Sequence, residues 1–202
     1  MNSETATTQR GRPRNFNQND ALEKAMRVFW RQGYEGASLG ELTEAMGINK
    51  SSMYSVFGTK EELFRKAVEK YLADHVSFVP EALNEPTVQQ ALRKLFTQSV
   101  DFLTDKQTPL GCFVLQGALN CGQGFESIQQ QLIAQRLGYE SLLRQRFELA
   151  QTQYDLDSRI DAAVMAKYIA TVHEGLSIQA TSGATKEELM AVVEIVLNNF
   201  NS

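Results

Sequence analysis

The chain has few of the residues that metal and redox sites require. It holds only two cysteines and two histidines in 202 residues, and it has no C-x-x-C pair. His75 and His173 lie far apart in the sequence, so the closely spaced sets that bind zinc are missing. Free cysteines in a cytoplasmic chain are commonly small buried hydrophobes, and two of them do not imply a disulfide. We therefore expect no metal site and no cofactor.

Catalytic motifs and membrane-spanning segments are missing as well. The sequence has no Ser/His/Asp spacing and no glycine-rich phosphate loop, and its acidic residues are scattered along helical faces, where solvation explains them. No apolar run is long enough to span a bilayer, and the polar N-terminus lacks the hydrophobic region of a secretory signal. These absences predict a cytoplasmic protein that has no membrane partner and is not an enzyme.

The composition and charge distribution describe what is present. Hydrophobic residues make up 43% of the chain and charged residues 22%, which is typical of a globular protein. The net charge is −4, but residues 1–70 carry +2 and residues 71–202 carry −6. The basic excess therefore lies in the first third, while the acidic remainder would be repelled by a phosphate backbone.

The stretch 38–57 reads as two short helices joined by a sharp turn. Ser38 and Glu41 form an S-x-x-E capping box at the start of the first helix. Gly47 supplies the turn, because a residue with a Cβ resists the backbone conformation that such a turn needs. Asn49 is the expected N-cap of the second helix. This arrangement predicts a helix-turn-helix.

The second helix has one apolar face, formed by Met53, Val56 and Phe57. Its other face carries Lys50, Ser51, Ser52, Tyr54 and Ser55. One cation, small hydroxyls and a phenol suit contacts to phosphates and base edges, because short donors let a helix enter the major groove deeply. The alternative is a short surface helix that joins two larger ones.

Residues 21–71 contain A-M-R-V-F-W-R-Q-G-Y-E-G-A-S-L-G-E-L, M-G-I-N-K-S-S-M-Y-S-V-F and G-T-K-E-E-L-F. This part of the chain resembles the N-terminal domain of the TetR/AcrR family of transcriptional regulators. The resemblance covers about a third of the chain at fixed spacing across three consecutive helices, and beyond residue 80 it is architectural only. It implies a homodimer that binds double-stranded DNA, mostly as a repressor, and leaves a pseudo-palindromic operator when a small-molecule effector binds the C-terminal domain.

The expected DNA contacts extend to both sides of the second helix. Arg12 and Arg14, within R-G-R-P-R, are expected to follow the minor groove, with a solubilising tail as the alternative. Lys60 lies in the first turn of a helix, where a cation opposes the dipole, so a DNA phosphate is its expected partner. The resemblance implies phosphate contacts for both Tyr54 and Lys60. The full expected set is Arg12, Arg14, Ser38, Lys50, Ser51, Ser52, Tyr54, Ser55 and Lys60.

Hydrophobic periodicity predicts an all-α fold of about nine helices. We expect helices over residues 17–32, two within 38–57, then 59–78, 87–103, one within 111–125, 125–151, 158–181 and 185–200, with 79–86 as a linker. The expected domains are a disordered basic arm at 1–15, a three-helix DNA-binding domain at 16–70, and a larger effector-binding and dimerisation bundle at 71–202.

The segment 111–125 combines apolar side chains with four glycines and a few polar groups, which suits a small-molecule pocket. A buried helix with satisfied polar groups explains the pattern equally well, and the resemblance favours a pocket because the family places its ligand cavity among the middle helices. The residues expected to contact the effector are Phe96, Cys112, Phe113, Gln116, Asn120, Phe125, Tyr139 and His173. A redox-responsive or electrophile-responsive regulator that acts through Cys112 is an alternative, which some family members suggest.

The last two expected helices carry much apolar surface. Small residues recur along 158–181, and apolar residues form a continuous stripe along 185–200. This pair resembles the family's dimer interface, in which each subunit contributes two helices. The alternative is that both helices only close the core of the monomer. A helical interaction module without DNA binding is the remaining alternative, although it leaves the hydroxyl-rich face beside Lys50 and Lys60 unexplained.

Overall fold

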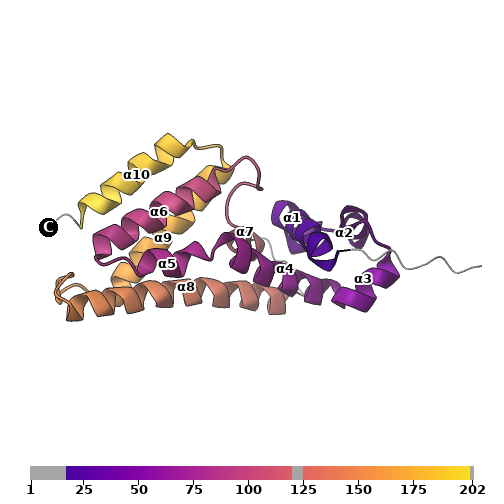
Figure 1. Ribbon diagram of the computed structural model, residues 1–202, viewed down its shortest axis with the longest axis horizontal. Helices are drawn as coiled ribbons and strands as arrows, with labels where there is room; N and C mark the ends of the chain where they lie inside the picture. The colour runs from indigo at the N-terminus through magenta and orange to yellow at the C-terminus, as the bar shows by residue number, and fades with distance from the viewer. Residues whose placement is uncertain (1–16, 120–124, 201–202) are drawn as a thin grey trace, which may run out of the picture.

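A computed structural model of the chain describes residues 17–119 and 125–200, and within these ranges every regular element is a helix (Figure 1). The all-α fold class is confirmed. None of the described helices combines the length and apolar character needed to cross a bilayer. The elements are α1 (Gln18–Gly36), α2 (Leu39–Met46), α3 (Lys50–Phe57), α4 (Lys60–His75), α5 (Phe78–Leu83), α6 (Val88–Leu103), α7 (Phe113–Leu119), α8 (Glu126–Thr152), α9 (Ala162–Thr181) and α10 (Lys186–Asn198).

The helices are distributed along one long axis (Figure 1). The first three helices gather at one end of the molecule, and α4 leads from them toward the middle. The long helix α8 runs along one edge, while α6, α9 and α10 pack together at the opposite end. Helix α4 is therefore the covalent connection between the two ends.

Several helix starts follow directly from local sequence. At each of four N-caps, the hydroxyl accepts a hydrogen bond from the third helical residue, whose side chain accepts one from the cap's backbone N–H. The pairs are Ser38 with Glu41, Thr59 with Glu62, Thr87 with Gln90, and Thr185 with Glu188. The box expected at Ser38 is confirmed.

The expected linker at 79–86 is wrong, since it contains most of α5 and raises the number of helices among the described residues to ten. Helix α4 ends at His75 instead of continuing to Phe78. Pro80 occupies the third position of α5, where the backbone N–H has no intrahelical partner in any helix, so proline is tolerated there. Val79 and Leu83 are buried, and their packing holds this short helix in place.

Two other helix boundaries differ from the sequence expectation. The segment assigned to α1 continues to Gly36, but Gly33 has φ 72° and ψ 176°, which is not helical, so the expected end of the regular helix becomes a sharp kink. Helix α9 starts at Ala162 instead of residue 158 because Asp161 is its N-cap and accepts hydrogen bonds from the backbone N–H groups of Ala163 and Val164.

Two hydrophobic cores meet in the middle of the chain. One core holds buried residues of α1 to α4 together with Phe113, Val114 and two residues from the first part of α8. The other holds residues of α5, α6, α9, α10 and the second half of α8. Three partly buried residues pack against both cores, and they are Val76, Phe102 and Cys112. The junction between the cores is thus formed by side chains rather than by a flexible linker.

Candidate functional site

The helix-turn-helix geometry arises from caps at each end of the turn. The Oγ of Ser38 accepts a hydrogen bond of 3.2 Å from the backbone N–H of Glu41 and fixes the start of α2. Gly47 ends α2 in the left-handed conformation, at φ 69° and ψ 29°, which glycine adopts without strain. The Oδ1 of Asn49 then accepts a 2.8 Å hydrogen bond from the N–H of Ser52 and starts α3. Both expected caps and the expected turn are confirmed.

Helix α3 presents its polar face to solvent. Met53 and Phe57 are buried, and the Nζ of Lys66 on α4 donates a 2.9 Å hydrogen bond to the carbonyl oxygen of Phe57, which anchors the end of the helix. The residues of the opposite face are exposed except for Ser52, which is half-buried, and they are Lys50, Ser51, Tyr54 and Ser55. Tyr54 is 48% exposed, a high value for a large aromatic residue. This face is free to meet a groove.

Lys60 has a partner within the described chain. Its Nζ lies 4.6 Å from the ring centroid of Tyr34, in a cation–π contact that accounts for the orientation of the side chain. Burial lowers the pKa of Lys60, and the carboxylates of Glu35 and Glu41 oppose that shift. Lys60 nevertheless stands directly after the exposed face of α3, at the start of α4. Arg12 and Arg14 lie outside the described residues.

A cavity of about 100 Å³ lies at the junction of the two cores. Its walls come from the end of α4, from α5, α7, α8 and α9, and from the residues beside them. The lining residues are Tyr71, Leu72, Val76, Val79, Cys112, Val114, Leu115, Gln135, Arg136, Tyr139, His173, Glu174 and Ser177. We refer to this cavity as the junction pocket.

Hydrogen bonds tie the walls of the junction pocket to one another. The Oη of Tyr71 on α4 donates to the Sγ of Cys112 at 3.4 Å. The backbone N–H of Cys112 donates to the Oγ of Ser177 on α9 at 2.8 Å. Burial raises the pKa of the Cys112 thiol, so in this conformation it is protonated and a weak nucleophile. Cys112 therefore links α4 to α9 in the pocket wall.

The pocket holds some of the expected effector residues and leaves others outside. Cys112, Tyr139 and His173 line it. Phe96 and Phe113 are fully buried, one in each core, and are absent from the lining. Gln116, which donates to the carbonyl of Leu110, and Phe125, which packs against Tyr34, are also outside the lining. Asn120 and Cys121 are not among the described residues.

Five polar lining residues were not among the expected contacts: Tyr71, Gln135, Arg136, Glu174 and Ser177. Arg136 and Tyr139 are three residues apart on one helix, and Glu174 follows His173. These spacings are local signals, because residues three apart share a helical face. Nothing in the sequence alone shows which faces of α4, α8 and α9 meet, so the full set depends on tertiary packing.

His173 provides a pH-dependent contribution to stability. Burial lowers its pKa from 6.5 to about 4. Between pH 6.5 and pH 4, His173 is protonated in the unfolded chain and neutral in the folded chain. The free energy of unfolding should therefore fall as the pH drops from 6.5 to 4. A full shift of this size corresponds to about 3 kcal/mol, and we expect less because the ring is only partly buried.

Denaturant unfolding of wild type and His173→Gln at a series of pH values measures this contribution. The carboxylates and His75 titrate in both proteins, so the difference between the two curves isolates His173. We expect the stability of the variant to decline less steeply between pH 6.5 and pH 4. Parallel curves would contradict the assignment.

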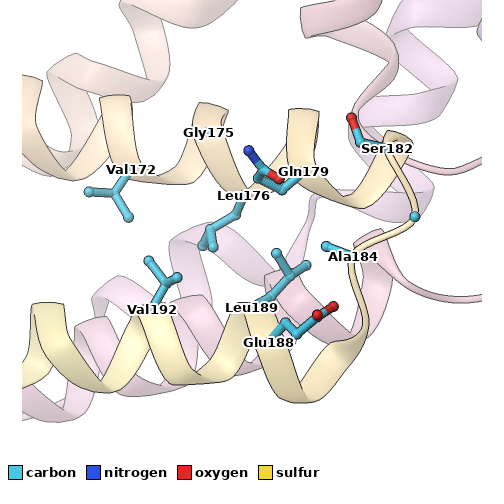
Figure 2. A pocket seen from close by; sticks show the side chains of 10 residues that line it. Val172, Gly175, Leu176, Gln179, Ser182, Ala184, Glu188, Leu189 and Val192 are labelled. Atoms are coloured by element: carbon cyan, nitrogen blue, oxygen red, sulfur yellow. The ribbon is translucent and has the colours of Figure 1, made fainter.

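A second hollow lies on the surface between α9 and α10 (Figure 2). Figure 2 shows Val172 and Leu176 of α9 facing Leu189 and Val192 of α10 across it. An added Cβ at Gly175 would meet no described atom within 4 Å, so the space above this glycine is open. Large apolar side chains are exposed on both helices, with 66% exposure for Val164, 39% for Tyr168, 46% for Ile178, 45% for Val192 and 68% for Ile195.

Comparison with known proteins agrees with both parts of the chain. The family model described as bacterial regulatory proteins, tetR family, matches residues 21–67, and the model described as tetracyclin repressor-like, C-terminal domain, matches residues 88–195. The HTH-type transcriptional repressor ComR of Escherichia coli K12 is 32% identical over 191 residues, which cover 93% of this chain and 90% of ComR. The uncharacterized regulator YezE of Bacillus subtilis 168 is 30% identical over 197 residues, covering 93% and 98%.

A solved structure extends the similarity to three dimensions. A triple cysteine mutant of the TetR family regulator CifR, complexed with 26-bp double-strand operator DNA, superposes with a TM-score of 0.89 at 39% identity, covering 93% of this chain and 98% of CifR. The helix-turn-helix at one end, the helical bundle at the other and these similarities lead to one conclusion. The chain belongs to the TetR family of bacterial regulatory proteins and is a DNA-binding transcriptional regulator.

Proposed function

We propose that the chain is a cytoplasmic homodimeric repressor that leaves a pseudo-palindromic operator when a small molecule enters the junction pocket. The observation that carries this proposal is the composition of the pocket wall. Tyr71 and Leu72 belong to α4, which directly follows α3, the proposed recognition helix. His173 and Ser177 belong to α9, which bears exposed apolar side chains. A ligand in this pocket would touch both parts at once.

The exposed face of α3 supports the DNA contacts of the proposal. Its serine hydroxyls are short donors and acceptors that can reach base edges. Tyr54, on the same face, and Lys60, at the start of α4, would contact the phosphate backbone. A single recognition helix buries little surface and discriminates modestly. A two-fold dimer that reads two half-sites at a fixed separation supplies the missing specificity.

The α9–α10 surface supports the homodimer. Exposed apolar side chains on both sides of the hollow would be removed from water if a second copy packed against them. Gly175 leaves open space at the centre of this surface, so the backbone of a partner helix could approach closely. The two recognition helices would then be held at a separation fixed by a helical interface.

The size of the junction pocket supports ligand-controlled release. Drug-sized ligands occupy cavities of roughly 300–1,000 Å³, and the pocket offers about 100 Å³. A larger occupant would have to displace wall residues, and Tyr71 and Leu72 would transmit that displacement to α4. The effector would act by binding the expanded conformer more tightly than the closed one, since only differential affinity shifts such an equilibrium.

Selection of bound fragments from a random DNA pool tests the proposal. Binding of the selected fragment is then measured across salt concentrations and with candidate effectors. We expect a pseudo-palindromic site with a steep salt slope, because phosphate neutralisation releases counterions. No enriched site, or binding that does not depend on salt, would overturn the proposal and favour an interaction module without DNA.

Substitutions at Lys60 and on the exposed face of α3 should distinguish residues that set the affinity for DNA from residues that set the base preference. Lys60→Ala and Tyr54→Phe are expected to weaken binding to selected and scrambled DNA alike, and Lys60→Ala should reduce the salt slope by about 1. Ser51→Ala, Ser52→Ala or Ser55→Ala should instead change which base pair is preferred, with about 1–3 kcal/mol at the affected position. Titration of single-base operator variants measures both effects. Equal losses on selected and scrambled DNA for the serine variants would contradict the base-reading role.

A further inference from the structure

Two hydrogen-bond donors in the wall of the junction pocket have no partner. The Oη of Tyr139 and the Nε of Arg136 are buried and make no hydrogen bond with any described residue. Both residues belong to α8 and are three positions apart, so they share one helical face. A buried donor without an acceptor costs about 1–3 kcal/mol. Two such donors on the helical face that lines a cavity point to a site for an acceptor atom.

Two acceptors of the pocket wall are engaged elsewhere. The Sγ of Cys112 receives the hydrogen bond of Tyr71, and the Oγ of Ser177 receives that of the Cys112 backbone. Glu174 lies 3.9 Å from the Nη1 of Arg136, so this carboxylate faces the far end of the guanidinium. The Nε of Arg136 and the hydroxyl of Tyr139 have no acceptor among the described residues, so both can bond to a guest.

The charges of the pocket exclude an ionised guest. Arg136 and Glu174 form an ion pair and cancel each other. Burial raises the pKa values of Tyr71, Tyr139 and Cys112 and lowers that of His173, so all four are neutral at pH 7. The described lining holds no other cation to balance a carboxylate and no other anion to balance an amine. Burying an unbalanced charge is strongly unfavourable.

The apolar walls and the volume of the junction pocket limit the size and shape of the hydrocarbon part of the ligand. The aliphatic side chains of the lining are Leu72, Val76, Val79, Val114 and Leu115. A cavity of about 150 Å³ lined by such residues accommodates a benzene-sized molecule. The junction pocket is about a third smaller at about 100 Å³, so a six-membered ring would displace the wall and bind the expanded conformer. Its occupant is therefore a compact ring or short branched chain.

We propose that the effector is a compact, uncharged organic molecule with one hydrogen-bond-accepting oxygen, of which a cyclic ketone is the simplest example. Its oxygen accepts from the Oη of Tyr139 and the Nε of Arg136, and its hydrocarbon body packs against the valines and leucines of the wall. This inference rests on the proposed function, because it assigns a ligand class to the pocket that the repressor model uses for release.

Three probes of similar shape test the ligand class with the full chain. Cyclohexanone carries the acceptor oxygen, methylenecyclohexane replaces it with CH₂, and cyclohexanecarboxylate adds a negative charge. Isothermal titration calorimetry should give cyclohexanone an affinity at least about tenfold above that of either other probe, because one satisfied buried donor is worth about 1.4 kcal/mol or more. Equal affinities, or preference for the carboxylate, would overturn the ligand class.

Variants separate the hydrogen bond from the packing. Tyr139→Phe removes only the hydroxyl and should lower cyclohexanone affinity about tenfold while leaving methylenecyclohexane affinity unchanged. Arg136→Met removes the second donor, and it provides an independent test if Tyr139→Phe does not fold. Tyr154→Phe is the matched control, since Tyr154 is 97% exposed and lies outside the pocket lining. Unchanged cyclohexanone binding in both pocket variants would overturn the inference.

Operator binding measured in parallel distinguishes this inference from the proposed function. Release by cyclohexanone that is lost in Tyr139→Phe supports both. Tyr139-dependent binding of cyclohexanone without any change in operator affinity supports the ligand class and overturns release through this pocket. Release by one of the other two probes, with no cyclohexanone binding, overturns the ligand class and leaves the repressor model standing.

Discussion

Ile195→Glu is expected to convert the proposed dimer into monomers at micromolar concentration and to weaken operator binding by about a hundredfold or more. Ile195 is 68% exposed on α10, the largest exposed fraction among the apolar side chains of the α9–α10 surface. In an isolated subunit a carboxylate at this position would remain in water, so the fold itself should be unaffected. The effect appears only when a second subunit covers the residue.

The two-fold symmetry of a homodimer multiplies the effect. Each interface would contain two copies of the new carboxylate, and each would lose its hydration without gaining a cation. If each copy costs about 2 kcal/mol, which is the low end for burying a polar group without a partner, the dimer is weakened by about a thousandfold. Operator affinity falls with it, because a monomer holds only one recognition helix and reads one half-site.

Sedimentation velocity at several protein concentrations measures the association, and fluorescence anisotropy with the selected operator measures the binding. Leu137→Glu is the matched control, since Leu137 is 56% exposed on α8 and lies outside the α9–α10 surface. We expect the control to remain dimeric and to bind the operator as the wild type does. An Ile195→Glu protein that stays dimeric would place the interface elsewhere.

The features that the sequence predicted correctly depend on residues that are close together in the chain. The caps at Ser38 and Asn49 each depend on a side chain and a backbone N–H three positions away. The polar face of α3 follows from helical periodicity in the same way, because eight residues suffice to separate its two sides. These local patterns were sufficient to predict the helix-turn-helix formed by α2 and α3.

The features that sequence did not predict depend on tertiary packing. Pro80 and Pro86 suggested a linker, but burial of Val79 and Leu83 stabilises a six-residue helix that would not form in isolation. The junction pocket is a stronger case. Tyr71 and Ser177 are more than a hundred residues apart, and both reach the same cavity only because α4 and α9 pack around Cys112.

Lys60 has a partner that the sequence did not indicate. A cation in the first turn of α4 opposes the helix dipole, which suggested an external phosphate. The ring of Tyr34, 26 residues earlier in the chain, lies 4.6 Å from the ammonium group and supplies a partner from within the protein. Helical periodicity cannot reveal such a pairing, because it depends on how α1 packs against α4. The phosphate contact of Lys60 remains a prediction for the DNA-bound state.

Trp30→Ala is expected to lower the free energy of unfolding by about 3–5 kcal/mol. Trp30 is the single tryptophan of the chain and is 1% exposed. Its ring packs against Tyr71 and His75 of α4 and against Phe102 of α6, with centroid distances of 4.9, 5.5 and 5.7 Å. Its removal would leave a cavity that these rigid aromatic neighbours cannot fill by small movements.

Denaturant unfolding followed by circular dichroism measures the loss, since the variant has no tryptophan fluorescence. Protein concentration must be held constant, because the proposed dimerisation would contribute to apparent stability. Leu137→Ala, which shortens a side chain that is 56% exposed, is the control and should change stability by less than about 0.5 kcal/mol. A loss below about 1 kcal/mol for Trp30→Ala would contradict the packing argument.

Trp30→Phe divides the effect between packing and hydrogen bonding. The Nε1 of Trp30 donates a 3.2 Å hydrogen bond to the carbonyl oxygen of Gly111, in the loop that precedes α7. Phenylalanine keeps an aromatic ring but leaves that buried carbonyl without this donor, so we expect an intermediate loss of about 1–3 kcal/mol. Cys112 follows Gly111 and donates a backbone hydrogen bond to Ser177 of α9. The indole of Trp30 therefore connects α1, in the DNA-binding domain, to a helix proposed for dimerisation. If this connection matters for release, Trp30→Phe should alter the response of operator binding to effector more than an equally destabilising change remote from the junction.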